Sequence, residues 1–529
     1  MPAATFDAQR ARRTLFEALL EAAREHGPGK TIVVDADGQA LTYKRLIQGA
    51  MVLGARLARE TSPGYPVGVM LPNASGAVVT LMALSAYGRT AAMLNFTAGH
   101  RSLASALATG PIRVILTSRR FIDAAKLEDV IAHLETVEPI PGKRVRIIYL
   151  EDLRASIGTA AKLAGAAKAL IAGNVHRRHA LAADKPGVVL FTSGTEGAPK
   201  GVVLSNTNLV ANARQSLEHA GSMLTPADVV MNPLPMFHSF GLTAATLMPL
   251  LGGMKVVLYP SPLHYKQVTK SIRDSKATVL FATDTFLQGY ARAADPEDLA
   301  SIRYVIAGAE RVKDQTRSMW SRTGATILEG YGATECSPVI ACNLPHMNRA
   351  GTVGPLLPGI EARLTQVDGI AEGGLLSVRG ANVMSGYLLA DAPGVVRAPD
   401  GGWHDTGDIV TLDGDNVVTI RGRAKRFAKI GGEMVSLAAV EAMVAQLWPD
   451  AQHVVVGLPD ERKGEQLVLV TDKADADKAA LLAYAKTQGV PELWVPRAIL
   501  VIGTIPVMGT GKVDLPATTA LARSTRPLL

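Results

Sequence analysis

Apolar positions near the N-terminus recur at helical intervals and then change to short continuous runs. Within residues 14–25 apolar side chains return every three or four positions, which predicts an amphipathic helix. Thr31–Val34 is short and β-branched, as expected of a strand, and Thr42 can cap a helix that extends to about Glu60. The chain therefore begins with mixed helical and strand segments.

From Val67 to Lys429, apolar runs of strand length alternate with stretches of helical spacing. A strand that is apolar throughout is typical of a sheet covered on both faces. The alternation predicts α/β layers with largely parallel sheets. The predicted strands are Val67–Leu71, Val114–Leu116, Val188–Phe191, Val229–Met231, Val256–Leu258, Thr278–Phe281, Tyr304–Ala307 and Thr326–Leu328.

Two later regions depart from this pattern. Gly359–Gly422 has short strands between Asp-Gly and Gly-Gly turns, which predicts a small β-rich subdomain. Beyond it, Leu437–Leu447 and Lys478–Gln488 have helical spacing on either side of the strand Gln452–Gly457. We therefore expect an α/β protein with a large N-terminal domain of layered α/β subdomains plus the β-rich one, residues 1–425, and a smaller mobile C-terminal α+β domain, residues 426–529.

The composition fits a protein with a large hydrophobic core. Of the 529 residues, 48% are hydrophobic and 19% are charged, which excludes a disordered chain. The net charge is +8, but no zinc-finger spacing, RNP pattern or basic region leading into heptads is present, so we expect no nucleic-acid partner. The only two cysteines, Cys336 and Cys342, exclude a disulfide framework and favour a reducing cytosol.

Neither of the two most apolar stretches is long enough to predict a membrane-spanning helix. These are Ala77–Tyr87 and Gly158–Asn174. The second is alanine-rich and carries Lys162 and Lys168, so it could form a basic amphipathic helix on a membrane surface. An ordinary surface helix is the favoured interpretation. We expect a cytoplasmic protein with at most peripheral contact with the inner face of the cell membrane.

The strongest local signal is the loop that follows the predicted strand Val188–Phe191. Residues 191–201 hold glycines at 194, 197 and 201, hydroxyl side chains at 192, 193 and 195, and Lys200. Such a loop offers many backbone N–H groups to phosphate oxygens, and the lysine adds positive charge. Its spacing is not that of a Walker A loop.

Six segments together resemble the adenylate-forming superfamily of acyl-CoA synthetases, peptide-synthetase adenylation domains and luciferases. The loop at 191–201 resembles its phosphate loop. The other segments, in chain order, are Pro235–His238, Ala307–Glu310, Tyr331–Glu335, Trp403–Asp408 with Arg421–Arg423, and Gly509–Lys512. The order and spacing of all six make chance agreement negligible.

A closer resemblance is to the acyl-ACP synthetase half of the bifunctional 2-acylglycerophosphoethanolamine acyltransferase/acyl-ACP synthetase. It extends nearly end to end. The segments that carry it are Met70–Ala74, Asn95–Gly99, Tyr259–Tyr265, Arg421–Ile430 and Gly489–Leu493.

The superfamily resemblance implies ATP and Mg²⁺ as cofactors and a set of binding residues. Glu335 would be the magnesium ligand, and Asp408 with Arg423 would hold the ribose hydroxyls. The nucleotide-binding residues implied are Thr192, Ser193, Gly194, Thr195, Glu196, Gly197, Lys200, Gly308, Ala309, Glu310, Glu329, Gly330, Tyr331, Gly332, Asp408 and Arg423.

The resemblance also implies the catalytic residues Lys512, Glu335, Thr334 and His238. Lys512 would bridge the carboxylate and the α-phosphate during formation of acyl-AMP, and His238 would lie between the acyl pocket and the thiol tunnel. Arg426 would be the hinge of the C-terminal domain, where the wider superfamily has Asp or Lys. Gly431 and Gly432 would line the thiol tunnel.

The expected function is activation of a fatty acid to acyl-AMP and its transfer to the phosphopantetheine thiol of acyl carrier protein. The basic run Arg421–Lys429 favours this acidic acceptor. The alternative is a fatty acyl- or aryl-CoA ligase with the same first half-reaction, in which coenzyme A is the acceptor. A catalytically silent nucleotide-binding module is disfavoured because Lys200, Glu335 and Lys512 are all present.

Overall fold

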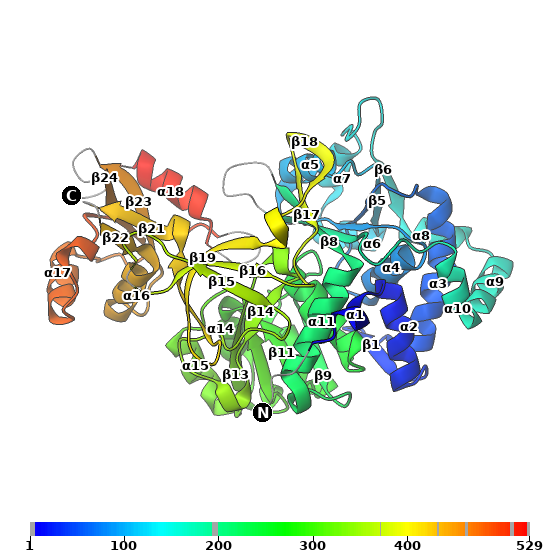
Figure 1. Cartoon of the computed structure of the whole chain (residues 1–529), viewed down its shortest axis with the longest axis horizontal. Helices are drawn as coiled ribbons and strands as arrows, with labels where there is room; N and C mark the ends of the chain where they lie inside the picture. Colours follow the sequence, from blue (N-terminus) through cyan, green and yellow to red (C-terminus); the bar gives the residue numbers. More distant parts are fainter. Residues whose placement is uncertain are drawn as a thin grey trace. The chain divides into compact units, whose positions relative to one another are not determined.

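The computed structural model describes residues 6–192, 199–370, 372–430, 433–460, 464–507 and 513–525 (Figure 1). The chain divides into two compact units. The first comprises Met1–Glu361 with Arg379–His404, and the second comprises Ala362–Val378 with Asp405–Leu529. The two-domain α/β expectation is confirmed.

The first unit contains two eight-stranded sheets. One has the order β14-β13-β12-β11-β9-β10-β1-β2 and is parallel except for its edge strands β2 and β14. Its strands are β1 Thr31–Asp35, β2 Ala40–Thr42, β9 Val229–Asn232, β10 Lys255–Leu258, β11 Val279–Ala282, β12 Tyr304–Ala307, β13 Thr326–Gly332 and β14 Val339–Cys342.

The other sheet has the order β18-β17-β8-β7-β4-β3-β5-β6. Strands β7, β4, β3, β5 and β6 are parallel, and β8, β17 and β18 extend the sheet in antiparallel pairs. Their bounds are β3 Val67–Val69, β4 Ala91–Met93, β5 Val114–Thr117, β6 Arg146–Tyr149, β7 Pro186–Thr192, β8 Lys200–Ser205, β17 Gly386–Leu389 and β18 Ala392–Arg397.

The placement of β17 and β18 corrects one expectation. Both lie within the segment Gly359–Gly422 that was expected to form a small β-rich subdomain. Instead, Tyr387 of β17 stands opposite Val202 of β8 in the large sheet. Local turn signals mark where strands begin and end, but they do not determine which distant strand becomes the partner.

Helices pack on these sheets and bury the cores of the first unit. Thr14 forms a capping box with Glu17, and Thr42 accepts a hydrogen bond from the amide of Arg45, so the expected helix starts are confirmed. The helices are α1 Ala8–Ala11, α2 Leu15–His26, α3 Tyr43–Glu60, α4 Ser75–Ala86, α5 Gly99–Thr109, α6 Arg119–Ala125, α7 Glu128–Leu134, α8 Leu150–Ser156, α9 Thr159–Leu170, α10 Ala172–Arg177, α11 Asn206–Ala220, α12 Met248–Leu251, α13 Tyr265–Ser275, α14 Asp284–Ala293 and α15 Asp314–Trp320.

The second unit contains two smaller sheets. The four-stranded sheet β15-β16-β19-β20 is formed by β15 Glu361–Thr365, β16 Gly374–Arg379, β19 His404–Leu412 and β20 Val418–Arg423. The five-stranded sheet has the path β22-β21-β24-β23, with β25 paired to β24. Its strands are β21 Phe427–Ile430, β22 Glu433–Ser436, β23 His453–Asp460, β24 Gly464–Thr471 and β25 Ala498–Val501, and its helices are α16 Leu437–Leu447, α17 Lys478–Thr487 and α18 Leu515–Ser524.

The boundary expected between residues 425 and 426 falls inside the second unit, between its two sheets. It stays a prediction about which part of the chain moves. Among the described residues, no helix is both long enough and apolar enough to cross a membrane.

Candidate active site

The glycine-rich loop connects two adjacent antiparallel strands of the first unit. Thr192 is the last residue of β7, and it stands opposite Lys200, the first residue of β8. Because β7 lies in the parallel part of the sheet, its carboxyl end is the edge where such sheets bind ligands. Of the expected phosphate-binding residues, Ser193, Gly194, Thr195, Glu196 and Gly197 lie outside the described residues.

A tyrosine that the sequence did not single out links two of the expected site residues. The Tyr387 hydroxyl donates a hydrogen bond to Glu335 Oε1 at 2.7 Å. Lys200 Nζ lies 5.5 Å from the centroid of the Tyr387 ring, within the range of a cation–π interaction. Glu335 and Lys200 are therefore held at the same tyrosine, although they are 135 residues apart in the sequence.

Burial explains why the phenol of Tyr387 is protonated. Burial is the largest cause that raises the pKa of Tyr387, followed by the neighbouring charge of Glu335. The phenol therefore stays protonated at neutral pH and acts as a hydrogen-bond donor. No local motif signals this role, because the contact depends on the pairing of β17 with β8.

Thr334 and His238 lie on neighbouring segments of the first unit. The hydroxyl groups of Ser239 and Thr334 are 3.5 Å apart. His238 is half-buried, and its ring centroid lies 4.6 Å from that of Phe237. Phe237 in turn has an edge contact with Phe96, which has another with Phe121. An aromatic, apolar region thus adjoins His238.

The expected nucleotide-binding residues Gly308, Ala309 and Glu310 follow the carboxyl end of β12. Gly308 faces the ring of Phe240, since a Cβ atom at this glycine would lie 3.0 Å from Cζ of the phenylalanine. Ala309 has a positive φ of 70°, an uncommon conformation for a residue with a side chain. Glu310 accepts hydrogen bonds from both the amide and the hydroxyl of Thr285.

Glu329, Gly330, Tyr331 and Gly332 lie together in β13. Glu329 is 5% exposed, accepts from the amide of Val312 and pairs with Arg317, so its carboxylate has structural partners within the protein. Tyr331 is buried. Gly332 has no room for a side chain, because a Cβ atom there would lie 2.2 Å from the carbonyl oxygen of Pro338.

The available oxygen ligand, the carboxylate of Glu335, suits a magnesium ion that binds together with a nucleotide. No group of three or more His, Cys, Asp and Glu side chains that could hold a metal occurs among the described residues. Mg²⁺ is commonly bound by one or two carboxylates together with substrate phosphates. Glu335 supplies such a carboxylate, and its hydrogen bond to Tyr387 uses Oε1.

The expected ribose pair lies in the second unit and is joined across two strands. Asp408 of β19 and Arg423 of β20 are register partners, and Arg423 Nε lies 3.1 Å from Asp408 Oδ1. Asp408 is 5% exposed, whereas the side chain of Arg423 is 69% exposed. The arginine can therefore contact a ligand from solvent while it orients the buried carboxylate.

The expected hinge residue is anchored in the C-terminal part of the second unit. Arg426 bonds the carboxylate of Glu441 on α16 at 2.5 Å and the carbonyl of Val455 on β23 at 3.0 Å. Gly431, Gly432 and Lys512 lie outside the described residues. Their roles stay predictions.

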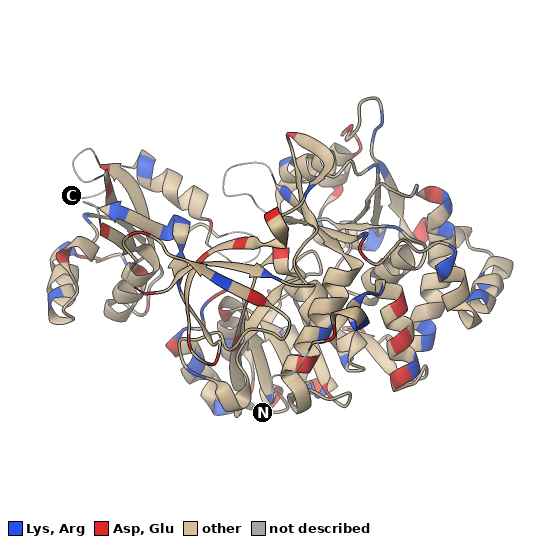
Figure 2. Ribbon diagram, in the orientation of Figure 1, with Lys and Arg blue, Asp and Glu red and all other residues tan. Residues whose placement is uncertain are grey.

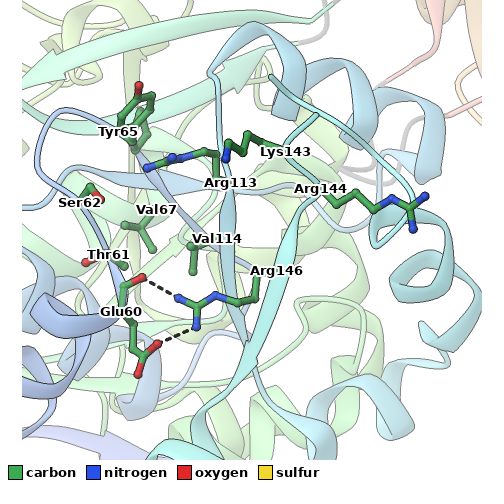
Figure 3. A pocket seen from close by; sticks show the side chains of 11 residues that line it. Glu60, Thr61, Ser62, Tyr65, Val67, Arg113, Val114, Lys143, Arg144 and Arg146 are labelled. Carbon is green, nitrogen blue, oxygen red and sulfur yellow. Dashed lines mark hydrogen bonds and ion pairs between the residues drawn. The ribbon is translucent and has the colours of Figure 1, made fainter. Parts of the chain in front are cut away.

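A separate pocket of about 320 Å³ lies at the amino ends of β3, β5 and β6, the sheet edge opposite the one that Thr192 reaches (Figure 3). Arg113 stacks on Tyr65 there, and Arg146 pairs with Glu60. None of the expected site residues lines it. Its lining residues are Glu60, Thr61, Ser62, Tyr65, Pro66, Val67, Arg113, Val114, Lys143, Arg144 and Arg146.

Curated relatives match the chain over most of its length. It is 28% identical over 490 residues to a feruloyl-CoA synthase of an Amycolatopsis species, with 90% of this chain and 93% of the relative covered. It is 27% identical over 535 residues to a long-chain-fatty-acid–CoA ligase of Bacillus subtilis, with 95% and 93% covered. It is 28% identical over 506 residues to a medium-chain fatty-acid–CoA ligase of Escherichia coli, with 92% and 87% covered.

Solved structures share the fold. An ATP-bound MatB from Rhodopseudomonas palustris superposes with a TM-score of 0.79 at 24% identity, covering 97% of this chain and 98% of that one. An o-succinylbenzoate CoA synthetase from Bacillus subtilis, in complex with its acyl-adenylate intermediate, gives a TM-score of 0.76 at 22% identity, with 98% and 99% covered.

A family model extends over the loop, the Glu335 segment and the part of β17 that contains Tyr387. The model that matches residues 19–388 is that of the AMP-binding enzymes. This stretch is more than half of the chain. The chain therefore belongs to the AMP-binding enzyme family, which confirms the expectation of an AMP-forming acid–thiol ligase.

Proposed function

We propose that this protein activates a carboxylic acid with an apolar body as its acyl adenylate, using ATP, and then transfers the acyl group to coenzyme A. The arrangement that carries the proposal is the one around Tyr387, which contacts both Glu335 and the loop lysine Lys200. A carboxylate for a metal–phosphate complex and a cation for the phosphates are the groups that adenylation needs.

The relatives support coenzyme A as the acceptor. The feruloyl, long-chain and medium-chain enzymes described above are all named for CoA. The expected closeness to acyl-ACP synthetases has no such support, so the alternative stated from the sequence becomes the favoured function. Fatty or aryl acids fit the aromatic side chains of Phe237, Phe96 and Phe121 beside His238.

The first half-reaction joins two anions. A carboxylate oxygen of the acid attacks the α-phosphorus of ATP, the bond to the β-phosphate oxygen breaks, and pyrophosphate leaves. Magnesium bound with the phosphates supplies charge neutralisation. Glu335 would hold that ion, and Tyr387 keeps the carboxylate in position. Lys200 would neutralise phosphate charge, and Asp408 with Arg423 would orient the ribose. Lys512 would bridge the two reactants.

The second half-reaction breaks the mixed anhydride. The sulfur of the acceptor attacks the acyl carbon, the thiol proton passes to solvent water, and AMP leaves with the electron pair of the broken bond. His238, with Phe237 at its side, would border the path between the acid and the thiol. Rotation of residues 426–529 about Arg426 would withdraw Lys512 and open the glycine-lined path at Gly431 and Gly432.

The test compares acceptors after the first half-reaction has been measured alone. Acid-dependent exchange of labelled pyrophosphate into ATP should occur without any thiol. Acyl transfer should then be followed with coenzyme A and, separately, with holo-acyl carrier protein. We expect turnover with coenzyme A at a kcat/KM at least about tenfold above that with carrier protein. The reverse order would restore the carrier-protein function, and no pyrophosphate exchange with any apolar acid would refute adenylation.

A further inference from the structure

Helix α9, residues Thr159–Leu170, carries an apolar face that points away from the protein. Leu170 and Leu163 are 83% and 67% exposed, the highest values among the large hydrophobic side chains of the described residues. Ile171, directly after the helix, is 54% exposed. Soluble surfaces carry single exposed leucines, but three such side chains within nine residues form a concentrated apolar patch.

The opposite side of α9 attaches the helix to the protein. Gly165 is the buried residue of the helix, and a Cβ atom there would lie 2.3 Å from Cγ2 of Val52 on α3. Ala169, one turn later, packs against the core. Leu163, Ala167 and Leu170 have the spacing i, i+4 and i+7, so they share the side of the helix opposite Gly165. The apolar patch is thus a fixed feature of the surface.

The charged residues of the chain segment that contains this face are all positive. Residues 153–183 contain no Asp or Glu, but they contain Arg154, Lys162, Lys168, Arg177 and Arg178. Figure 2 shows blue bands and no red ones on α9, and Figure 1 shows α10 beside it. An exposed apolar strip in a segment whose charged residues are all basic matches the chemistry of a bilayer surface that contains anionic phospholipid.

We propose that the face of α9 formed by Leu163, Ala167, Leu170 and Ile171 docks on an anionic membrane surface, with Lys162 and Lys168 contacting the lipid phosphates. The leucines would enter the boundary between headgroups and acyl chains. Lys162 and Lys168 are exposed three residues before and after the buried Gly165, so they stand between the apolar strip and the protein, and their long stems would bring the ammonium groups to the phosphates. This docking is independent of the ligase activity, and each can fail without the other.

The test is co-sedimentation of the full-length protein with vesicles of phosphatidylcholine, with and without phosphatidylglycerol. The wild type should bind the mixed vesicles and bind pure phosphatidylcholine at least about tenfold less. Leu163→Ser with Leu170→Ser should lower binding to mixed vesicles about tenfold or more. Lys162→Gln with Lys168→Gln should lower it about thirtyfold at low salt and less at high salt.

Matched controls distinguish vesicle binding by this face from nonspecific binding by other exposed leucines and lysines. Leu482→Ser with Leu521→Ser removes two leucines that are 39% and 38% exposed elsewhere, and it should leave vesicle binding unchanged. Lys478→Gln with Lys486→Gln on α17 should also leave vesicle binding unchanged. All variants should keep wild-type thermal unfolding and wild-type rates with a water-soluble acid, because the changed side chains are exposed.

Three results would overturn the proposal. One is a wild type that does not bind phosphatidylglycerol vesicles. Another is undiminished binding by the double leucine variant. The third is a wild type that self-associates without lipid, in sedimentation velocity, and loses this association when Leu163 and Leu170 are replaced. The α9 face would then be a contact between copies of the chain.

Discussion

Tyr387 and Glu335 are joined by a 2.7 Å hydrogen bond although 52 residues separate them in the chain. The tyrosine comes from β17, which leaves the neighbouring β-rich segment and pairs with β8. The glutamate follows β13 in a short 3-10 helix, Thr334–Cys336. The contact therefore connects the two large sheets of the first unit at the expected magnesium ligand. Tyr387 is a positioning residue, since its hydroxyl acts through Glu335.

Tyr387→Phe should raise the KM for MgATP more than it slows the adenylation step that follows MgATP binding. A hydrogen bond to a charged group contributes about 1.5–3 kcal/mol, so its loss should raise the KM for MgATP about tenfold or more. The midpoint of Mg²⁺ activation should move to higher concentration, and calorimetry of MgATP binding should show the same loss. Tyr484→Phe, which removes a bond to Gln446 on the surface of the second unit, is the control. An unchanged Mg²⁺ midpoint would contradict the positioning role.

Lys512→Ala should separate the two half-reactions. Loss of one well-placed charge from a water-excluded site can cost about 3–4 kcal/mol, so acyl-AMP formation should fall by two to three orders of magnitude. Transfer from supplied acyl-adenylate to coenzyme A should survive. Pyrophosphate exchange measures the first half and thioester release the second. An equal loss of both would refute the idea that Lys512 serves only adenylation.

Asp408→Asn should weaken nucleotide binding while it leaves the fold intact. The pair with Arg423 contributes little to folding, because that arginine side chain is 69% exposed and screened by water. The carboxylate can accept from two ribose hydroxyls, so we expect about a tenfold rise in the Kd for ATP in calorimetry. Asp475→Asn, at the exposed pair with Lys473, should change nothing. Equal affinity of the wild type for 2′,3′-dideoxy-ATP and ATP would contradict the role of Asp408 in binding the ribose hydroxyls.

His219 should make the first unit less stable in mild acid. Its Nε2 lies 2.8 Å from the carbonyl oxygen of Cys342, and burial lowers the pKa of His219 below its usual 6.5. The unfolded chain then binds the proton first as the pH falls. The contribution of neutral His219 to the free energy of unfolding should therefore be fully present above about pH 7. It should decrease as the pH falls toward about pH 5. His219→Gln keeps a donor for the carbonyl, so its urea unfolding should show a smaller decrease over this range. Parallel pH profiles for the two proteins would contradict the assignment.

Features set by neighbouring residues could be predicted from the sequence, and features set by distant pairing could not. The expected cap at Thr42 acts within one helical turn, so the start of α3 was correct, and the helical spacing within residues 14–25 correctly indicated α2. The candidate phosphate loop could be recognised because its residues are contiguous, and its role stays a prediction. Tyr387 was missed because a tyrosine after a glycine has no chemistry of its own until β17 pairs with β8. The extent of the β-rich subdomain was wrong for the same reason.

The number of covalent connections limits which part of the chain can rotate alone. Between the two compact units the backbone crosses three times, after residues 361, 378 and 404. The two sheets of the second unit are joined only once, through Ala424–Arg426 between β20 and β21. A rotation at three crossings would have to bend three backbones together, whereas a rotation at one crossing changes only a few torsion angles. We therefore expect residues 426–529 to be the part that turns, and the backbone torsions of Ala424–Arg426 to set how far.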